Sequence, residues 1–266
     1  MNCKNCEREL ATDSDYCNGC GGKVIRNRLT IRNLFEHLSE TFFNYDNKLL
    51  RTFIDLFKKP EVVIDGYVKG VRKRYVNPIS FFGVILTVNG LNIFIITKFY
   101  KRYLDASNLL GDKNVANNEA SRKIMELTSD FSLEYASLLF SFLIPLAALL
   151  SWITFYNKKY NYTEHVILYL YSMSVYSILS VIFGLSTLAI APEKYLFFSS
   201  VMYLFLFLYH CYILTRLFKL NFGQLALKIF LFLVLFFFTY IGVSILSIVL
   251  LLITGTIDLQ DFMPNS

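Results

Sequence analysis

Long apolar runs dominate the chain from residue 79 onwards. Five of them hold about 18 residues or more each, namely 79–96, 133–156, 166–190, 195–215 and 225–254. A helix rises about 1.5 Å per residue, so each run can cross a hydrocarbon layer of about 30 Å. The pattern therefore predicts an all-α polytopic membrane protein with about five transmembrane helices in residues 79–254. The first run is the shortest and contains two asparagines, so the pattern leaves open whether it crosses completely.

A different pattern precedes these runs. In residues 29–76, apolar residues recur on one helical face and basic residues occupy the other. One such face is formed by Ile31, Leu34, Phe35, Leu38 and Phe42. A second helix is expected after Asp46, and Pro60 stops it and can open a third. These amphipathic juxtamembrane helices either lie in the inner membrane interface or form a small helical cap packed on the bundle. The pattern does not choose between the two.

The charge distribution predicts an orientation. Only 17% of the 266 residues are charged and 55% are hydrophobic, whereas soluble domains carry about a quarter charged residues. Residues 1–78 hold 14 of the 26 lysines and arginines, and the tail 255–266 holds none. The positive-inside rule therefore places the N-terminus in the cytoplasm and the tail outside. We therefore expect a multi-pass membrane protein with a cytoplasmic N-terminus.

Residues 1–24 contain two CxxC pairs separated by ten residues, Cys3 with Cys6 and Cys17 with Cys20. This spacing is typical of a zinc ribbon, in which four thiolates surround one Zn²⁺ tetrahedrally. Disulfides are the alternative, but they rarely persist in the reducing cytoplasm. The expected cofactor is thus one structural Zn²⁺ per chain, which supplies folding energy that so short a segment lacks. Gly19 and Gly21 occupy positions where such turns are expected to need positive φ.

The stretch "GYVKGVRKRYVNPISFF" lies directly before the first apolar run. Its cations and tyrosines are candidates for binding anionic lipid headgroups or a protein partner, and they are Tyr67, Lys69, Arg72, Lys73, Arg74 and Tyr75. The simpler alternative is a basic anchor that only sets the orientation of the first span.

Two parts of the chain carry a resemblance to a known family. They are "CKNC…YCNGCGGK" and a Y-x-x-G-x-R-x-x-Y-x-x-P-like stretch formed by Tyr67, Gly70, Arg72, Tyr75 and Pro78. With the spans that follow, they resemble a family of uncharacterised bacterial membrane proteins, domain of unknown function 3667. The resemblance covers mostly residues 1–82. It implies a zinc ribbon joined to a helical membrane segment in the bacterial inner (cytoplasmic) membrane, and it implies no activity.

Chemistry inside the membrane is sparse. No Asp, Glu, Lys or Arg lies well inside a span, apart from Lys228 near one end, although enzymes and ion-coupled carriers usually keep such groups at depth. The intramembrane polar candidates are Asn89 and Asn92, three residues apart on one helical face, and His210. Serines of the third span, such as Ser177 and Ser180, can hydrogen-bond between helices as well. No catalytic constellation is visible, so no enzyme activity is expected.

Two functions fit these patterns. The first is an integral membrane scaffold or adaptor that presents its zinc ribbon to a cytoplasmic or membrane protein partner, with a homo-oligomer possible. The alternative is a transporter, channel or lipid-handling protein with a regulatory zinc head. Membrane lipids, including anionic headgroups, are expected partners of either. Nucleic acid is not favoured, because the head has few basic residues, namely Lys4, Arg8 and Lys23.

Overall fold

The computed structural model describes residues 1–24, 30, 48–100, 131 and 135–254. The chain divides into two compact units, Met1–Asn47 and Lys48–Ser266. The amphipathic face expected in residues 31–42 lies outside the described residues, as does the tail 255–266.

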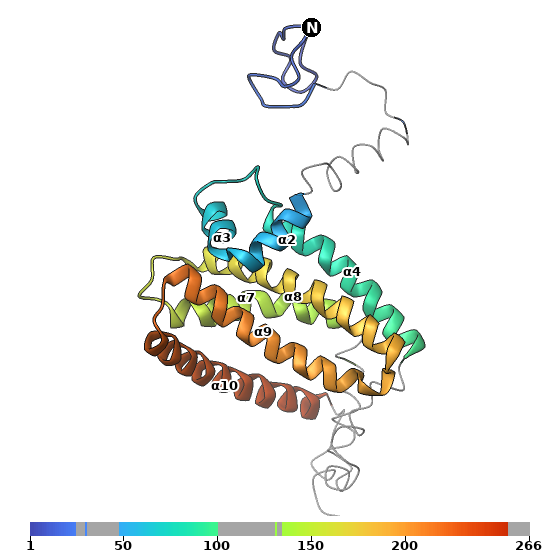
Figure 1. The fold of residues 1–266 in the computed structure, drawn as a ribbon, viewed down its shortest axis with the longest axis vertical. Helices are drawn as coiled ribbons and strands as arrows, with labels where there is room; N and C mark the ends of the chain where they lie inside the picture. The colour runs from blue at the N-terminus through green and yellow to red at the C-terminus, as the bar shows by residue number, and fades with distance from the viewer. Residues whose placement is uncertain (25–29, 31–47, 101–130, 132–134, 255–266) are drawn as a thin grey trace, which may run out of the picture. The chain divides into compact units, whose positions relative to one another are not determined.

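Five helices of the second unit are long and apolar enough to cross a membrane. They are α4 (Pro78–Phe99), α7 (Ala136–Thr154), α8 (Tyr162–Ile190), α9 (Tyr195–Phe218) and α10 (Phe222–Ile253) (Figure 1). The short turn η2 (Pro192–Lys194) directly precedes α9. Strand pairing within the described residues is limited to two isolated bridges, both in residues 1–24. The all-α polytopic membrane fold is therefore confirmed.

Two of these helices begin before the apolar runs that predicted them, because a capping box fixes each start. Asn161 accepts a hydrogen bond from the N–H of Glu164 (3.0 Å), whose carboxylate accepts one from the N–H of Asn161 (2.8 Å). Asn221 and Gln224 form the same reciprocal pair at the start of α10. Such pairs satisfy N–H groups that the first turn leaves free. As a result, α8 starts at residue 162 and α10 at residue 222.

α8 is the central helix of the bundle, since it packs against α4, α7 and α9. Tyr171 and Val175 of α8 are fully buried and share one core with Phe81 of α4 and Ala148 of α7. In contrast, no residue of α10 is buried, although α10 is the most apolar of the five helices. An apolar helix that packs so little against protein is suited to face lipid on most of its surface.

The helices α2 (Lys48–Lys58) and α3 (Pro60–Val68) pack against the bundle on α8 and α9 (Figure 1). Leu56 and Ile64 are fully buried, in the same core as Ile213 of α9. The hydroxyl of Tyr209 donates a hydrogen bond to the carbonyl oxygen of Leu56 (3.1 Å). Residues 48–68 thus form a helical cap on the bundle, which is one of the two arrangements that the sequence left open for residues 29–76.

Candidate metal centre

The cysteine-rich head, residues 1–24, consists of two turns with the same backbone hydrogen bonds. In each turn the N–H of the first cysteine donates to the carbonyl five residues later, and its own carbonyl accepts the N–H four residues later. These bonds measure 2.8–2.9 Å and are Cys3 N–Arg8 O, Glu7 N–Cys3 O, Cys17 N–Gly22 O and Gly21 N–Cys17 O. An isolated antiparallel bridge joins residues 2 and 9 in the first turn and residues 16 and 23 in the second. Each CxxC pair is thereby held in the same way by its own backbone.

Each turn also places a left-handed residue directly after its second cysteine. This residue is Glu7 (φ 59°) in the first turn and Gly21 (φ 69°) in the second. The prediction of positive φ is confirmed for Gly21 and is wrong for Gly19. A Cβ at Gly19 would lie 2.8 Å from Nη1 of Arg8, the far end of an exposed side chain that can move aside, so packing does not require glycine there either. Glycine tolerates positive φ freely, whereas the left-handed conformation costs other residues about 1–2 kcal/mol.

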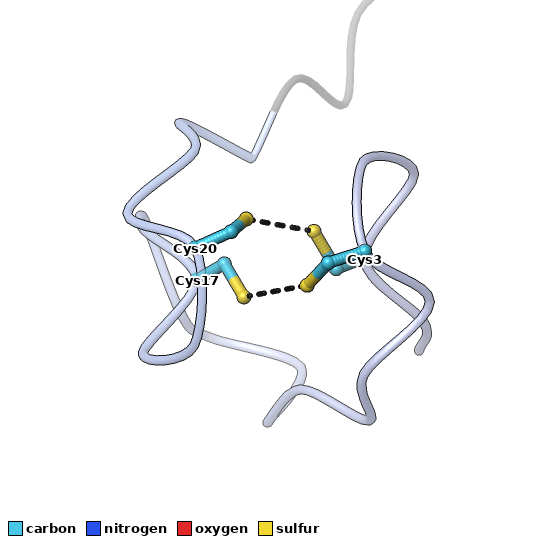
Figure 2. Close-up of side chains that lie close together, drawn as sticks. Cys3, Cys17 and Cys20 are labelled. Atoms are coloured by element: carbon cyan, nitrogen blue, oxygen red, sulfur yellow. Dashed lines mark hydrogen bonds between the residues drawn. The ribbon is translucent and has the colours of Figure 1, made fainter.

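The two turns bring all four sulfur atoms together. The Sγ atoms of Cys3 and Cys20 are 3.7 Å apart, and those of Cys6 and Cys17 are 3.6 Å apart (Figure 2). All four lie within 4.8 Å of one another. Tetrahedral coordination with zinc–sulfur bonds of about 2.3 Å separates the sulfurs by about 3.8 Å. The donor set and its spacing therefore fit a metal ion at this site.

Hydrogen bonds prepare two of the thiols to lose their protons. Nδ2 of Asn5 donates to Sγ of Cys20 (3.5 Å), and this bond, together with a backbone N–H, lowers the pKa of Cys20 to about 6. The backbone N–H groups of Cys20 and Gly19 lower the pKa of Cys17. A backbone N–H also acts to lower the pKa of Cys6, but hydrogen bonds with the neighbouring thiols outweigh it and raise this pKa to about 11. A cation among the sulfurs favours the thiolate form, so metal binding releases protons.

The head buries little besides these cysteines. Its core comprises Leu10, Cys3 and Cys17, with Val24 partly buried against them. So small a core is insufficient to fold a segment of this length, and a bound metal ion can supply the missing stability. Four thiolates also complete a tetrahedral shell and leave no open position for a substrate or a reactive water. The fifth cysteine, Cys211, lies in α9 of the other unit.

The two tyrosines of the basic stretch point into the protein. Tyr67 is 6% exposed and Tyr75 is 3% exposed. The hydroxyl of Tyr75 donates to the carboxylate of Asp55 (2.8 Å), and that of Tyr67 accepts hydrogen bonds from Asn77 Nδ2 (3.1 Å) and Arg72 Nη1 (3.3 Å). Both rings belong to the core beneath the cap. Of the six residues predicted here for lipid or partner contact, the four cations are therefore the accessible ones.

The cations themselves remain at the surface. All four predicted ones are exposed, namely Lys69, Arg72, Lys73 and Arg74. The ammonium group of Lys69 forms an ion pair with Asp65, one helical turn earlier. The guanidinium of Arg72 lies 4.3 Å from the centre of the Tyr67 ring. The loop between α3 and α4 thus carries its charges outside and is fastened by aromatic rings inside.

The intramembrane polar residues fall into two places. Asn89 and Asn92 line a cavity of about 950 Å³ among the membrane-spanning helices. Nε2 of His210 lies 2.9 Å from the hydroxyl oxygen of Ser172, and this contact joins α9 to α8 outside that cavity. The structure brings the asparagines together and places the histidine at a helix–helix contact.

Sequence reasoning singled out Ser177 and Ser180 but missed the tyrosine hydroxyl groups that α8 and α9 add to the cavity. Tyr176 of α8 and Tyr195 and Tyr203 of α9 line it together with Ser177 and Ser180. The cluster of hydroxyl residues at 176–180 was a local signal. Its convergence with α4 and α9 depends on packing, which residue spacing does not reveal.

Comparison with known proteins supports part of the expected resemblance. Residues 46–89 match the family model described as "Protein of unknown function (DUF3667)". The match covers α2, α3, the basic loop and the first half of α4, and the resemblance is confirmed over these residues. No curated protein and no solved structure matches the chain. The five helices and the cysteine cluster describe a multi-pass membrane protein with a metal-binding head.

Proposed function

We propose that this protein is a non-enzymatic membrane scaffold or adaptor whose zinc-loaded head binds a protein partner. The observation that carries the proposal is the closed four-cysteine site in a unit separate from the membrane helices. A closed thiolate site is chemically inert and makes a short segment rigid, which suits recognition. The excess of Lys and Arg before the first span supports a cytoplasmic head in a bacterial inner membrane.

The surface of the head offers recognition chemistry. Tyr16 is 62% exposed, and an exposed tyrosine combines an apolar ring with a hydroxyl group. Tyrosine is enriched among residues that dominate binding energy in protein interfaces. Glu7 and Arg8 are also exposed, so the head mixes both charge signs. Such a surface favours a protein partner over nucleic acid, which requires a basic face.

The test compares two serine variants of the full chain in its native membrane. Cys17→Ser removes one of the clustered thiols, and Cys211→Ser is the matched control because Cys211 lies in α9. Both proteins are purified in mild detergent after cross-linking, and their bound zinc and cross-linked partners are measured. We expect one zinc per chain and a captured partner in the wild type and in Cys211→Ser. Cys17→Ser should insert normally and lose both the zinc and the partner.

Equal capture by all three proteins would contradict the adaptor role, even if the zinc content differed. Metal analysis is an independent readout, because the absence of zinc from the wild-type protein would overturn the proposed cofactor. Native mass spectrometry of the same samples counts subunits, which identifies a second copy of the chain as the partner where there is one.

A second candidate function is transport or lipid handling, with the head regulating the bundle. The cavity that Asn89 and Asn92 line favours it. Polar side chains beside a cavity within a membrane bundle are typical of sites that act on a solute or lipid. The matching test is flux or lipid transfer in proteoliposomes, where Asn92→Leu should lower the rate and Cys17→Ser should alter its control.

A further inference from the structure

The cavity in the membrane bundle has the size and shape of a ligand site. Its volume of about 950 Å³ is at the upper end of the range for small-molecule pockets, about 300–1,000 Å³. Most of its walls are apolar side chains of α4, α7, α8 and α9, with Val243 contributed by α10. The lining comes from the second half of α4 and the first half of α9. The cap, in contrast, packs near Tyr209 and Ile213 in the second half of α9.

Asn92 gives this apolar cavity an unsatisfied polar group. The side chain lines the cavity and the residue is only 8% exposed, yet its Oδ1 accepts no hydrogen bond from any described residue. Oδ1 has almost no accessible surface in this orientation, so a ligand reaches it only after rotation of the amide, which exchanges Oδ1 and Nδ2. A hydroxyl group, which both donates and accepts, can pair with either atom. A buried amide left unpaired in a membrane protein is costly, which favours a bound ligand that pairs with it.

The remaining polar groups of the cavity restrict the charge of such a ligand. Among the described residues that line the cavity, none is Asp, Glu, Lys, Arg or His. The polar lining consists of amides and hydroxyl groups, such as Asn89, Ser177 and Tyr203. A phosphate or ammonium group placed here would lose its water without gaining an opposite charge, which is strongly unfavourable. The lining therefore selects an uncharged polar group attached to an apolar body.

We propose that the cavity binds an uncharged lipid with a free hydroxyl group, such as a diacylglycerol. The hydroxyl group hydrogen-bonds with Asn92, and the hydrocarbon chains lie along the apolar walls of α7 and α9. The site gives the second candidate function a substrate class, and it does not depend on the head. Neither the adaptor role nor the metal site is needed for it.

The test uses a diacylglycerol with a photoreactive diazirine in one acyl chain, added to the full-length protein in lipid nanodiscs. After illumination, mass spectrometry locates the labelled residues. Because the diazirine lies in an acyl chain, we expect saturable labelling in residues 136–149 of α7 and 203–206 of α9, which unlabelled diacylglycerol abolishes. Phosphatidic acid with the same acyl chains should compete at least about tenfold less well, because its only difference is the charged phosphate.

Four variants separate the site from general lipid contact and from the head. Asn92→Leu should weaken the saturable labelling at least about fivefold, because it removes one hydrogen bond between the ligand and a buried polar group. Thr87→Val is the matched control, since Thr87 is exposed on the same helix and its hydroxyl donates to Gly83 of that helix. Ser180→Phe keeps Asn92 and fills the cavity, so it should also abolish labelling. Cys17→Ser should label like the wild type, which separates this result from the adaptor proposal.

Labelling spread over lipid-facing residues such as Phe236–Phe238 of α10, without competition, would overturn the proposal. Equal competition by phosphatidic acid would overturn the uncharged headgroup. Unchanged labelling in both Asn92→Leu and Ser180→Phe would exclude this cavity as the site. A thermal unfolding curve for each variant shows that it is folded before its labelling is compared.

Discussion

Because the cap, α2 and α3, packs on the bundle, we predict that Leu56→Ala destabilises the cap far more than Leu50→Ala does. Both leucines lie on α2, but Leu56 is fully buried in the shared core and Leu50 is 51% exposed. Truncating a buried leucine to alanine costs about 2–5 kcal/mol, because apolar contacts are lost and a cavity remains. The same truncation at an exposed position changes stability by about 0.5 kcal/mol or less.

Hydrogen exchange of the full chain in nanodiscs measures this difference locally. The relevant amides are those of residues 48–68, which form α2 and α3. When the cap opens and closes faster than exchange, each 1.4 kcal/mol lost from its stability speeds exchange about tenfold. Leu56→Ala should therefore accelerate these amides between about thirtyfold and several thousandfold. Leu50→Ala provides the baseline, with an acceleration of about twofold or less.

Equal hydrogen-exchange rates of residues 48–68 in the two variants would refute this prediction. Equal rates would mean that α2 does not bury Leu56 against α8 and α9 in the membrane, as expected of a helix lying free in the interface. Acceleration spread evenly over α4, α8 and α9 would also contradict it, since the cap would then not open as a unit.

Four further predictions follow from the head and the cap. A strong zinc chelator should unfold residues 1–24 and leave the helix content of the second unit unchanged, as followed by limited proteolysis and circular dichroism. Glu7→Gly should stabilise the metal-loaded head by about 1 kcal/mol, because Glu7 has a φ of 59°; no gain in chelator resistance would contradict this. Tyr75→Phe removes a hydrogen bond to Asp55 and should lower the free energy of unfolding by about 1.5–3 kcal/mol near pH 7. Burial, and then Asp55, raise the pKa of Tyr75 from 10.0 to about 12, so the wild type should lose stability as pH rises through that interval and the Phe variant should not. Burial alone would raise the pKa of Glu61, but hydrogen bonds from Arg216 lower it overall. The free energy of unfolding should therefore decrease as pH drops below about 4.5, by under about 1 kcal/mol. Glu61→Gln should make this decrease smaller.

The membrane helices could be predicted because length and apolarity decide them. A run of about 18 apolar residues leaves the backbone no arrangement in lipid other than a helix, so all five appear where expected. Their starts depend on single polar residues instead. Asn161 and Glu164 are three residues apart, as are Asn221 and Gln224, and both pairs are visible in the sequence as capping boxes. The cysteine cluster was equally accessible, because a CxxC turn is local.

Positions that depend on contacts distant in sequence could not be predicted in this way. Tyr67 and Tyr75 flank exposed cations, and an interfacial position at headgroup depth fitted the local pattern. The structure buries both rings because Asp55 and Asn77 supply partners for their hydroxyl groups. The same holds for the cavity, since Asn92 and Tyr203 meet only through the packing of α4 and α9 with α8.

Within the matched residues 46–89, side-chain hydrogen bonds join parts of the chain that lie far apart in the sequence. Three of the side-chain hydrogen bonds inside this range join residues 10 to 24 positions apart, namely Thr52 with the N–H of Val76, Asp55 with Tyr75, and Tyr67 with Asn77. α8 adds one more, from the hydroxyl of Tyr171 to the carbonyl of Val76 (2.7 Å). These bonds hold both ends of the basic loop, which fixes Arg72, Lys73 and Arg74 at one edge of the cap. A loop held in this way loses little conformational freedom when it binds an anionic headgroup or partner. A property shared with the family is therefore expected in this loop, whereas the functions proposed for the head and for Asn92 rest on residues outside the match.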